Sequence, residues 1–382
     1  MTRRSVGVNE RVDGRLLVIT ALLVAGGLLV LYSASAPFSL RHFGTDTHML
    51  LRQFIAAAAG AVALTVFALL DYHRLAALSD ALMVGGLALS AATLLPVGFA
   101  DGRWLLIGPF PIQPTEFLKL AWILYLARTI ARKKDDIRSF GRGVLPFLFL
   151  LTLLAMVLLN QPDLGMLLIF GAVTMTMLYL GGAKLGHLAA VCGGSLPLVA
   201  LAIRLAPYRF ARVLSFLNPE AYSTSSGYQT LQSLIAVGSG GMFGRGLGAS
   251  RAKLFYLPQA HNDFILSIVA EELGLLGVLL VLTLVGLLVW RAFGISERAG
   301  DELGRLLALG IGFALAFQAL LNTGVVLGLL PVTGLTFPFL SNGGSSLLVT
   351  MAMVGVLLNV SRKRGGEAGA YATGLGVRGG LA

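Results

Sequence analysis

The sequence predicts an all-α integral membrane protein with about ten transmembrane helices and one long extracytoplasmic loop between helices seven and eight. Of its 382 residues, 56% are hydrophobic and only 12% are charged, whereas about a quarter of the residues in soluble domains are charged. The apolar residues form long blocks, and several blocks reach the roughly 20 residues that cross the hydrocarbon core. This small number of charged residues cannot cover the surface of a soluble protein of this size. We therefore expect the chain to lie in a lipid bilayer.

Ten apolar segments have the length and composition of membrane helices. They span residues 15–36, 50–70, 79–98, 113–131, 143–160, 163–181, 184–206, 263–291, 304–329 and 343–360. Together they predict a membrane domain over residues 15–361, preceded by a short cytoplasmic segment, 1–14. A glycine-rich cytoplasmic tail, 362–382, follows, and we expect it to be disordered because it offers little apolar surface to bury.

Lysine and arginine gather on alternate sides of these segments, which predicts their orientation. If the N-terminus is cytoplasmic, the inside segments hold most of the 29 basic residues. The most basic connection joins helices four and five and contains Arg128, Arg132, Lys133, Lys134, Arg138 and Arg142. Ten crossings then place both termini in the cytoplasm, in a multi-pass protein of the cytoplasmic (inner) membrane. The net charge of +11 is explained by topology and by contacts to anionic lipid, and no nucleic-acid partner is expected.

Residues 207–262 form a segment that is too long for a simple connection. It contains a glycine-rich stretch, Gly238–Gly248, that matches neither the dinucleotide fingerprint nor the phosphate loop. It also carries a set of cations that suits a phosphate or pyrophosphate ligand. These cations are Arg209, Arg212, Arg245, Arg251 and Lys253.

Ionisable residues at membrane depth are costly and are therefore candidates for function. The sharpest candidate is Asp263, which follows His261 where the long outer loop becomes helix eight. A helix-start role, favoured by the helix dipole, is the simple alternative. A base beside a cationic loop indicates group transfer from a phosphate leaving group. No second histidine or cysteine lies at metal spacing from His261, so we predict no metal site built from side chains alone.

Four further acids lie in or at the mouth of a helix. Glu116 shares a helix face with Lys119, and mutual neutralisation is the simple interpretation. Asp163 begins another helix and is expected to act as its N-cap. Glu271 lies about 12 Å deeper than Asp263 on the same helix face, and Glu272 points about 100° away. We expect one of this pair to bind an arginine, a lysine or a backbone end.

Short motifs spread along most of the chain are more specific. They are Leu31-Tyr-Ser-Ala-Ser35, Arg103-Trp104, Gln113-Pro-Thr-Glu-Phe-Leu-Lys119, Gln161-Pro-Asp-Leu-Gly165, Pro207-Tyr-Arg-Phe-Ala-Arg212, Gly227-Tyr-Gln-Thr-Leu-Gln-Ser233, Leu257 through Gly274, and Gly334-Leu-Thr-Phe-Pro-Phe-Leu-Ser-Asn-Gly-Gly-Ser-Ser346. In this order they resemble the SEDS family (shape, elongation, division and sporulation). Leu254–Pro258, Ala249–Lys253 and Gly334–Thr336 are more similar to the FtsW division branch than to the RodA elongation branch.

The resemblance implies a peptidoglycan glycosyltransferase that polymerises lipid II into septal glycan strands at the outer membrane face and releases undecaprenyl pyrophosphate. The family aspartate falls on Asp263, which is expected to be the general base. The loop cations would hold the pyrophosphate, helped by a divalent cation, magnesium or manganese, bound mainly by substrate phosphates. Further substrate contacts are expected from Arg103, Glu116, Lys119, His261, Ser345 and Ser346. Expected partners are lipid II, the growing glycan strand, a class B penicillin-binding protein and other divisome membrane proteins.

Three positions depart from the family pattern. Gln259 stands where the family usually has glutamate, Asn262 where it has threonine, and Asn342 where it has tyrosine. These changes affect the expected substrate contacts and leave the assignment of Asp263 in place.

Three other functions remain open at this point. The first is a RodA-type elongation polymerase. The second is a lipid II flippase, which would need a polar path open to both membrane faces. The third is a non-catalytic scaffold of the division machinery, in which Asp263 would only start a helix.

Overall fold

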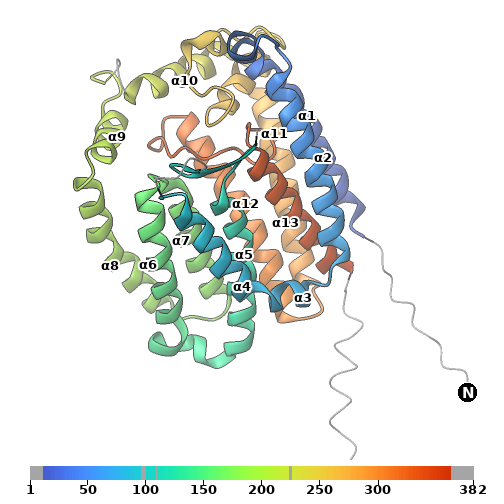
Figure 1. Ribbon diagram of the computed structural model, residues 1–382, viewed down its shortest axis with the longest axis vertical. Coiled ribbons are helices and arrows are strands. Elements are labelled where there is room, and N and C mark those ends of the chain that lie inside the picture. The colour runs from blue at the N-terminus through green and yellow to red at the C-terminus, as the bar shows by residue number, and fades with distance from the viewer. Residues whose placement is uncertain (1–11, 96–99, 109, 223–225, 363–382) are drawn as a thin grey trace, which may run out of the picture.

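The computed structural model describes residues 12–95, 100–108, 110–222 and 226–362. Within them the chain is a bundle of long helices, which confirms the predicted all-α membrane class (Figure 1). Each of the ten predicted segments overlaps one helix. These helices are α1 (Gly14–Phe43), α2 (His48–Leu69), α4 (Ser79–Ala92), α5 (Pro114–Lys133), α6 (Leu145–Asn160), α7 (Leu164–Leu180), α8 (Leu185–Arg204), α11 (Ile265–Glu297), α12 (Glu302–Val326) and α13 (Gly344–Arg362). Residues 1–11 of the predicted cytoplasmic N-terminal segment, and residues 363–382 of the tail that we expected to be disordered, lie outside the described residues.

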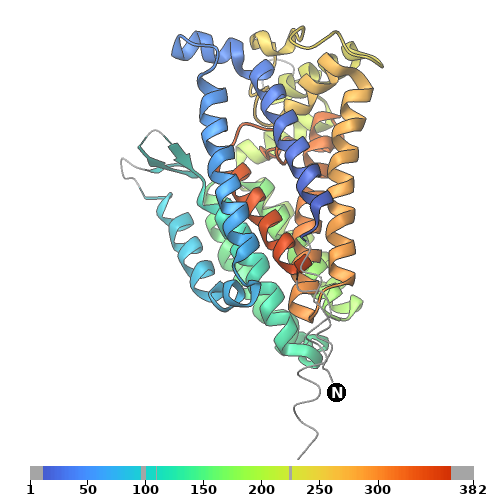
Figure 2. The same ribbon diagram turned by 90° about the vertical axis from the view of Figure 1, so that its right-hand side faces the viewer.

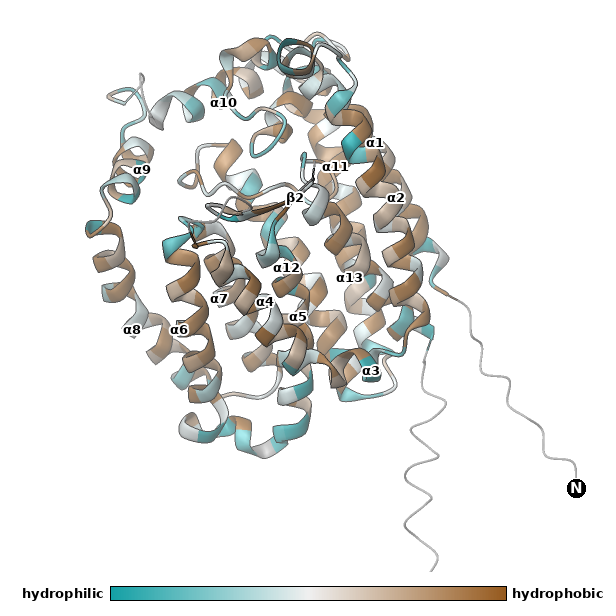
Figure 3. Cartoon of the chain, in the orientation of Figure 1, coloured by the Kyte–Doolittle hydropathy of each residue, from teal (hydrophilic) through white to brown (hydrophobic). Residues whose placement is uncertain are grey.

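The apolar surfaces of these helices fit a bilayer. Among the described residues, seven helical segments are long and apolar enough to cross a membrane. The helices α4 and α7 are apolar but shorter, and α5 is less apolar because it carries Glu116 and Lys119. Figure 3 shows the helix bodies coloured as hydrophobic and the polar residues gathered mostly at their ends. The multi-pass membrane character is clear, and the number of ten crossings stays a prediction.

Burial divides the bundle into a centre and a periphery. The helices α12 and α13 lie at the centre, since most of their residues are buried. By contrast, Leu188 is the one buried residue of α8 among those the structure describes. The exposed faces of α8 are apolar, so lipid is the expected neighbour there.

The predicted long loop, 207–262, contains helices that were not predicted from the sequence. It contains α9 (Pro207–Leu217), α10 (Ser226–Gly240) and a short helical turn, η3 (Ala252–Tyr256). Together with the connection from Leu327 to Gly343, these elements lie toward one end of the bundle, in the upper part of Figure 1, where α10 is uppermost. We call this end the site-bearing end. The start of α1 and the end of α13 lie at the opposite end (Figure 2).

A small antiparallel sheet at the site-bearing end was not predicted. Its strands are β1 (Ala100–Asp101), β2 (Trp104–Ile107) and β3 (Phe110–Ile112), in the order β1-β2-β3. The sheet places Arg103 in the turn between β1 and β2, immediately before α5 enters the bundle. The remaining short helices are α3 (Tyr72–Ala77), η1 (Lys134–Arg138) and η2 (Phe140–Val144).

The glycine-rich stretch has a structural explanation in a break of α11. The backbone of α11 leaves helical geometry at Gly274, where φ is +68°. The carbonyl oxygens of Glu271 and Glu272 accept hydrogen bonds from the backbone N–H groups of Arg245 and Gly246, at 3.0 Å each. A Cβ on Gly244 would lie 2.1 Å from the Glu272 carbonyl oxygen. Glycine is therefore required for the backbones to approach closely enough to satisfy the broken helix.

Candidate active site

Two carboxylates occupy the site-bearing end. Asp263 lies in the turn that precedes α11 and is partly exposed. Asp163 is buried and caps the N-terminus of α7, where its Oδ1 accepts from the Met166 N–H at 3.1 Å. Its Oδ2 accepts from the Gln113 side-chain amide at 3.0 Å. The predicted N-cap is thus confirmed, and the same carboxylate also faces the charged site described next.

Arg103 and Gly334 connect the two carboxylates. The Arg103 guanidinium lies 3.7 Å from Asp163 Oδ2. A Cβ placed on Gly334 would lie 3.5 Å from Arg103 Nη1 and 3.8 Å from Asp263 Oδ2. The guanidinium and the Asp263 carboxylate are therefore at most 7.3 Å apart, the sum of these two distances. Gly334 has a φ of +74°, so both the backbone geometry and the space favour glycine there.

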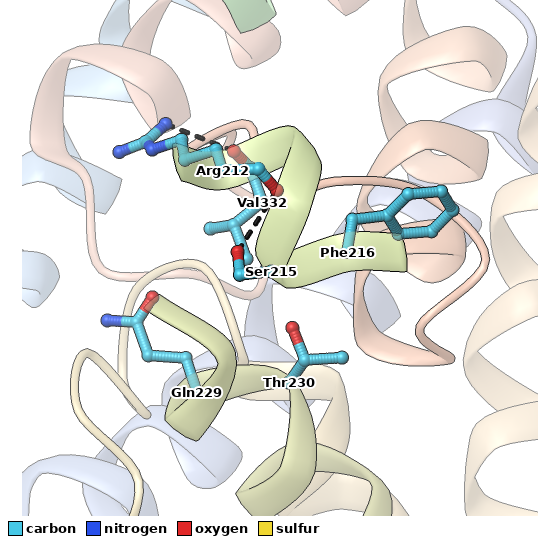
Figure 4. Close-up of a pocket in the computed structure, with 6 residues that line it drawn as sticks. All are labelled: Arg212, Ser215, Phe216, Gln229, Thr230 and Val332. Carbon is cyan, nitrogen blue, oxygen red and sulfur yellow. Dashed lines mark hydrogen bonds between the residues drawn. The ribbon is translucent and has the colours of Figure 1, made fainter. Parts of the chain in front are cut away.

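Arg212 supplies the second cation of the site. It extends from α9, and its Nη1 donates to the Val332 carbonyl oxygen at 3.0 Å. Figure 4 shows this bond at the edge of a small cavity lined by Ser215, Phe216, Gln229 and Thr230 as well. The charge of Arg212 acts on both Asp163 and Asp263. The site thus combines two carboxylates with two guanidinium groups.

The surroundings of Asp263 hold its pKa near neutrality. Burial is the main cause that raises the pKa of Asp263 to about 6; Arg103 and Arg212 lower it, and the carboxylate of Asp163 adds a smaller raising effect. Burial also raises the pKa of Asp163. A carboxylate with a pKa near the working pH can take and return a proton efficiently. Asp263 therefore has the electrostatic setting of a general base.

The backbone around Asp263 is held by three successive carbonyl contacts. The carbonyl oxygen of His261 accepts from the Asn342 N–H at 2.9 Å. That of Asn262 accepts from the Ser341 hydroxyl at 2.6 Å. The carbonyl oxygen of Asp263 itself accepts from the Asn322 side-chain amide at 2.8 Å. These contacts come from α12 and from the segment before α13, so Asp263 is fixed by parts of the chain that are far apart in sequence.

Glu116 and Lys119 form a buried ion pair beneath this site. The Lys119 ammonium lies 2.7 Å from the Glu116 carboxylate, and the two side chains are only 2% and 4% exposed. Lys119 also donates to Gln318 Oε1 at 2.9 Å. The predicted mutual neutralisation is confirmed. The negative charge of Glu116 contributes to the raised pKa of Asp163, so the pair is electrostatically connected to the site.

Ser345 and Ser346 continue this polar network from the start of α13. Ser345 Oγ accepts from the backbone N–H of Gln113 at 3.1 Å. The hydroxyls of Ser346 and Thr336 lie 3.0 Å apart, and the Gln318 amide donates to the Thr336 carbonyl oxygen at 2.9 Å. Both serines are buried, and their contacts tie α13 to the starts of the neighbouring elements.

Arg245 and Lys253 are paired with the acids of α11. The Arg245 guanidinium lies 3.2 Å from Glu271, and the Lys253 ammonium lies 2.7 Å from Glu272 and 2.8 Å from the Ser33 hydroxyl. Both acids of α11 therefore pair with a cation, whereas we expected one of them to do so. Glu271 also accepts from the Ser250 hydroxyl and from the backbone of the following residues. This anchoring holds the glycine-rich stretch against α11.

Three further residues predicted to contact the substrate, Arg209, Arg251 and His261, lie outside these ion pairs. Arg209 is buried, and its guanidinium donates to the carbonyl oxygens of Leu159 and Ala202, which ties α9 to the ends of α6 and α8. Arg251 is exposed at the site-bearing end. His261 is buried, and burial together with the nearby His42 lowers its pKa to about 4. It is therefore a neutral imidazole at neutral pH.

Several site residues were not predicted from the sequence. Asp163 was interpreted as a helix cap, and Asp163 and Gly334 were otherwise noted only as members of longer motifs. Gln318 and Asn322 did offer a signal, because two amides four residues apart in an apolar helix share one face. Asn322 joins the carbonyl oxygens of Asp263 and Leu335 through one side-chain amide.

The site offers few side-chain ligands for a divalent cation. Among the described residues, no group of three or more His, Cys, Asp or Glu side chains could hold a metal ion. Asp163 and Asp263 would supply at most two protein ligands beside two arginines. The residues therefore fit a magnesium or manganese ion only when phosphate oxygens of a ligand complete its coordination.

The apolar bundle with a buried charged network and a carboxylate–arginine site at one end defines a polytopic membrane protein with enzyme-like chemistry. A family model for FtsW, RodA and SpoVE, described as "cell cycle protein", matches residues 14–365. The chain therefore belongs to the FtsW/RodA/SpoVE family.

Its relatives match nearly full length. A protein of Trichlorobacter lovleyi named probable peptidoglycan glycosyltransferase FtsW is 41% identical, over 91% of this chain and 92% of its own. Stage V sporulation protein E of Bacillus subtilis is 42% identical, over 92% and 97%.

Solved structures agree with the fold. A chain from a study of polymerization and crosslinking by a peptidoglycan synthase complex superposes with a TM-score of 0.76 at 30% identity, over 92% of this chain and 98% of that one. The rod shape determining protein RodA of Thermus thermophilus superposes with a TM-score of 0.67 at 30% identity, over 92% and 97%.

Proposed function

We propose that the chain is a peptidoglycan glycosyltransferase that polymerises lipid II into glycan strands for septal wall synthesis. The observation that carries this proposal is the Asp263 carboxylate at the site-bearing end, at most 7.3 Å from the Arg103 guanidinium and with its pKa raised to about 6 by burial. A base of this strength suits removal of a proton from a sugar hydroxyl, and the cations suit a diphosphate leaving group. The names of the FtsW relatives support the division role over the RodA-type role in elongation.

In the proposed reaction, a hydroxyl oxygen of the acceptor sugar attacks the anomeric carbon of the donor. Asp263 takes the hydroxyl proton as the new glycosidic bond forms. The bond between the anomeric carbon and the pyrophosphate oxygen breaks, and its electron pair leaves with undecaprenyl pyrophosphate. Arg103 and Arg212 stabilise the growing negative charge. A divalent cation bound mainly by the substrate phosphates would neutralise part of the same charge.

Orientation follows from this chemistry and from the distribution of basic residues. We assign the site-bearing end to the outer face of the cytoplasmic membrane and both termini to the cytoplasm. The end of α5 and the connection from α5 to α6 lie at the opposite end (Figure 1), and they carry the basic cluster that includes Arg128, Lys133 and Arg142, in agreement with the positive-inside rule. A class B penicillin-binding protein is the proposed partner, since a structural relative comes from a complex that couples polymerization and crosslinking. Other divisome membrane proteins and the growing glycan strand complete the proposed partners.

The function is tested with purified protein, its penicillin-binding partner and lipid II, with glycan product resolved by length. Polymer made when the partner's own crosslinking is blocked supports the proposal. In vesicles, labelled lipid II that changes leaflet without forming glycan would instead support the flippase. A protein that does neither while still recruiting division proteins would be a scaffold.

A further inference from the structure

We propose that Gln259, Asn262 and Asn342 form a neutral saccharide subsite beside Asp263, which binds uncharged hydroxyl and acetamido groups of the acceptor glycan. The inference rests on the proposed polymerase function and deepens it, because it separates the part of the site that holds sugar from the part that holds diphosphate.

The three amides form one continuous hydrogen-bonded chain. The Asn342 amide donates to Asn262 Oδ1 at 3.1 Å. The Asn262 amide in turn donates to Gln259 Oε1. These are the same three positions at which the sequence departs from the family pattern, and two different segments of the chain bring them together. The departures thus form one physical unit.

Backbone contacts hold this chain of amides in place. Asn342 and Ser341 donate to the carbonyl oxygens of His261 and Asn262, as described above. Gln53 on α2 donates to the Ser341 carbonyl oxygen at 3.2 Å and accepts from the Gly343 N–H at 3.2 Å. The amides are therefore preorganised, which reduces the entropy lost when a ligand binds.

The chain leaves hydrogen-bonding groups for a ligand. A side-chain amide has two N–H donors and an oxygen with two lone pairs. The two bonds within the chain use one N–H donor of Asn342, one N–H donor of Asn262, and one lone pair on each of the acceptor oxygens, Asn262 Oδ1 and Gln259 Oε1. Both donors of Gln259 Nε2 remain outside the chain, and Gln259 is exposed, whereas Asn262 and Asn342 are partly exposed. These groups can donate to carbonyl and hydroxyl oxygens.

Charge separates this subsite from the rest of the site. The amides are uncharged, and His261 beside them is neutral because burial lowers its pKa to about 4. The two guanidinium groups act instead on the Asp263 carboxylate, and Gly334 lies beside both Arg103 and that carboxylate. A diphosphate is therefore drawn to the arginines, and the uncharged sugar groups are left to the amides.

Two substitutions at Gln259 separate recognition from structure. Gln259→Glu keeps the oxygen that accepts from Asn262 but removes both outward N–H donors, whereas Gln259→Leu removes the bond and the donors. The probes are a β-1,4-linked tetrasaccharide of N-acetylglucosamine and inorganic pyrophosphate, and binding of each to the purified complex is measured directly. Loss of one neutral hydrogen bond to the ligand predicts a roughly two- to tenfold weaker tetrasaccharide affinity in both variants. Pyrophosphate affinity should be unchanged in Gln259→Leu, which adds no charge to the site.

Arg212→Ala provides the reciprocal variant, with weakened pyrophosphate binding and unchanged tetrasaccharide binding. Asn218→Ala, at an exposed amide after α9, is the matched control and should bind both probes as wild type does. Melting temperatures check that each variant is folded. Wild-type tetrasaccharide affinity in a folded Gln259→Glu variant, or a wild-type protein that binds pyrophosphate and no tetrasaccharide, overturns the subsite. A wild-type protein that does not polymerise lipid II would instead overturn the proposed function. The two failures can be told apart because the binding measurements do not depend on turnover.

Discussion

Replacing Arg103 by glutamine is expected to move the pH dependence of polymerisation upward. Arg103 is the largest cationic influence on Asp263 and lowers its pKa. The two charges are at most 7.3 Å apart, from the distances at Gly334. At an effective dielectric constant of about 20 this separation gives about 2 kcal/mol. The Arg103 side chain is 31% exposed, so solvent screening reduces the effect to about 1–2 kcal/mol, or about one pH unit.

The sign follows from the role of the base. Polymerisation needs ionised Asp263, so kcat/KM of the wild-type protein should fall below about pH 6, the pKa of that carboxyl group. Without the Arg103 charge, ionisation becomes harder and the fall should begin near pH 7. The measurement is kcat/KM for lipid II between pH 5 and pH 8.5 in the complex with the penicillin-binding partner.

Arg74→Gln is the matched control, because Arg74 is an exposed cation on α3 at the opposite end of the bundle. Its pH profile should coincide with that of the wild-type protein. An Arg103→Gln profile that does not move, or that moves to lower pH, would refute the assignment of the acidic limb to Asp263 beside Arg103.

Three other outcomes follow from contacts in the bundle. Glu116→Gln or Lys119→Met alone should destabilise the fold by about 3–5 kcal/mol, because each leaves a buried charge without its partner. The double variant should lose less stability in thermal unfolding than the sum of the two single losses. Gly244→Ala should lower the free energy of unfolding by at least about 2 kcal/mol, since φ is positive there and the new Cβ would clash with the Glu272 carbonyl oxygen. The control Gly186→Ala, on the exposed face of α8, should leave the melting temperature unchanged or slightly raised. Asp263→Asn should raise the melting temperature at pH values above 6 but not below pH 4. The reason is that ionising a carboxyl group whose pKa is raised to about 6 costs the folded state up to about 3 kcal/mol. Equal melting temperatures of the variant and the wild-type protein at pH 8 would contradict that pKa.

Hydrophobic length alone located the long helices, because each membrane helix satisfies its backbone within its own segment. The same reasoning missed the sheet that carries Arg103, whose short strands have no periodic signal, and the helices α9 and α10. It also gave the glycine-rich stretch no role. That role depends on Gly274, where a helix breaks and borrows hydrogen bonds from the stretch.

The site was only partly predictable for a related reason. Asp263 could be found because it is a lone acid where an apolar helix begins after a basic segment. Asp163 has the same local signal, and the simpler role as a cap accounted for it until Arg103 was found beside it. Arg245 and Lys253 are close to Asp263 in sequence, yet their ion pairs lie along α11 with Glu271 and Glu272. Which cation faces which acid depends on packing between distant segments, and a single sequence does not contain that information.

The most direct test compares lipid II polymerisation by the wild-type protein and the Asp263→Asn variant, each purified with the penicillin-binding partner and shown by melting to be folded. Asparagine keeps the size of the side chain and its backbone contact to Asn322 but cannot accept the hydroxyl proton. We expect glycan synthesis to fall by a factor of at least about 100, the usual contribution of a general base, with lipid II binding largely retained. Glycan strands made at the wild-type rate by the folded variant would contradict the central role of this carboxylate.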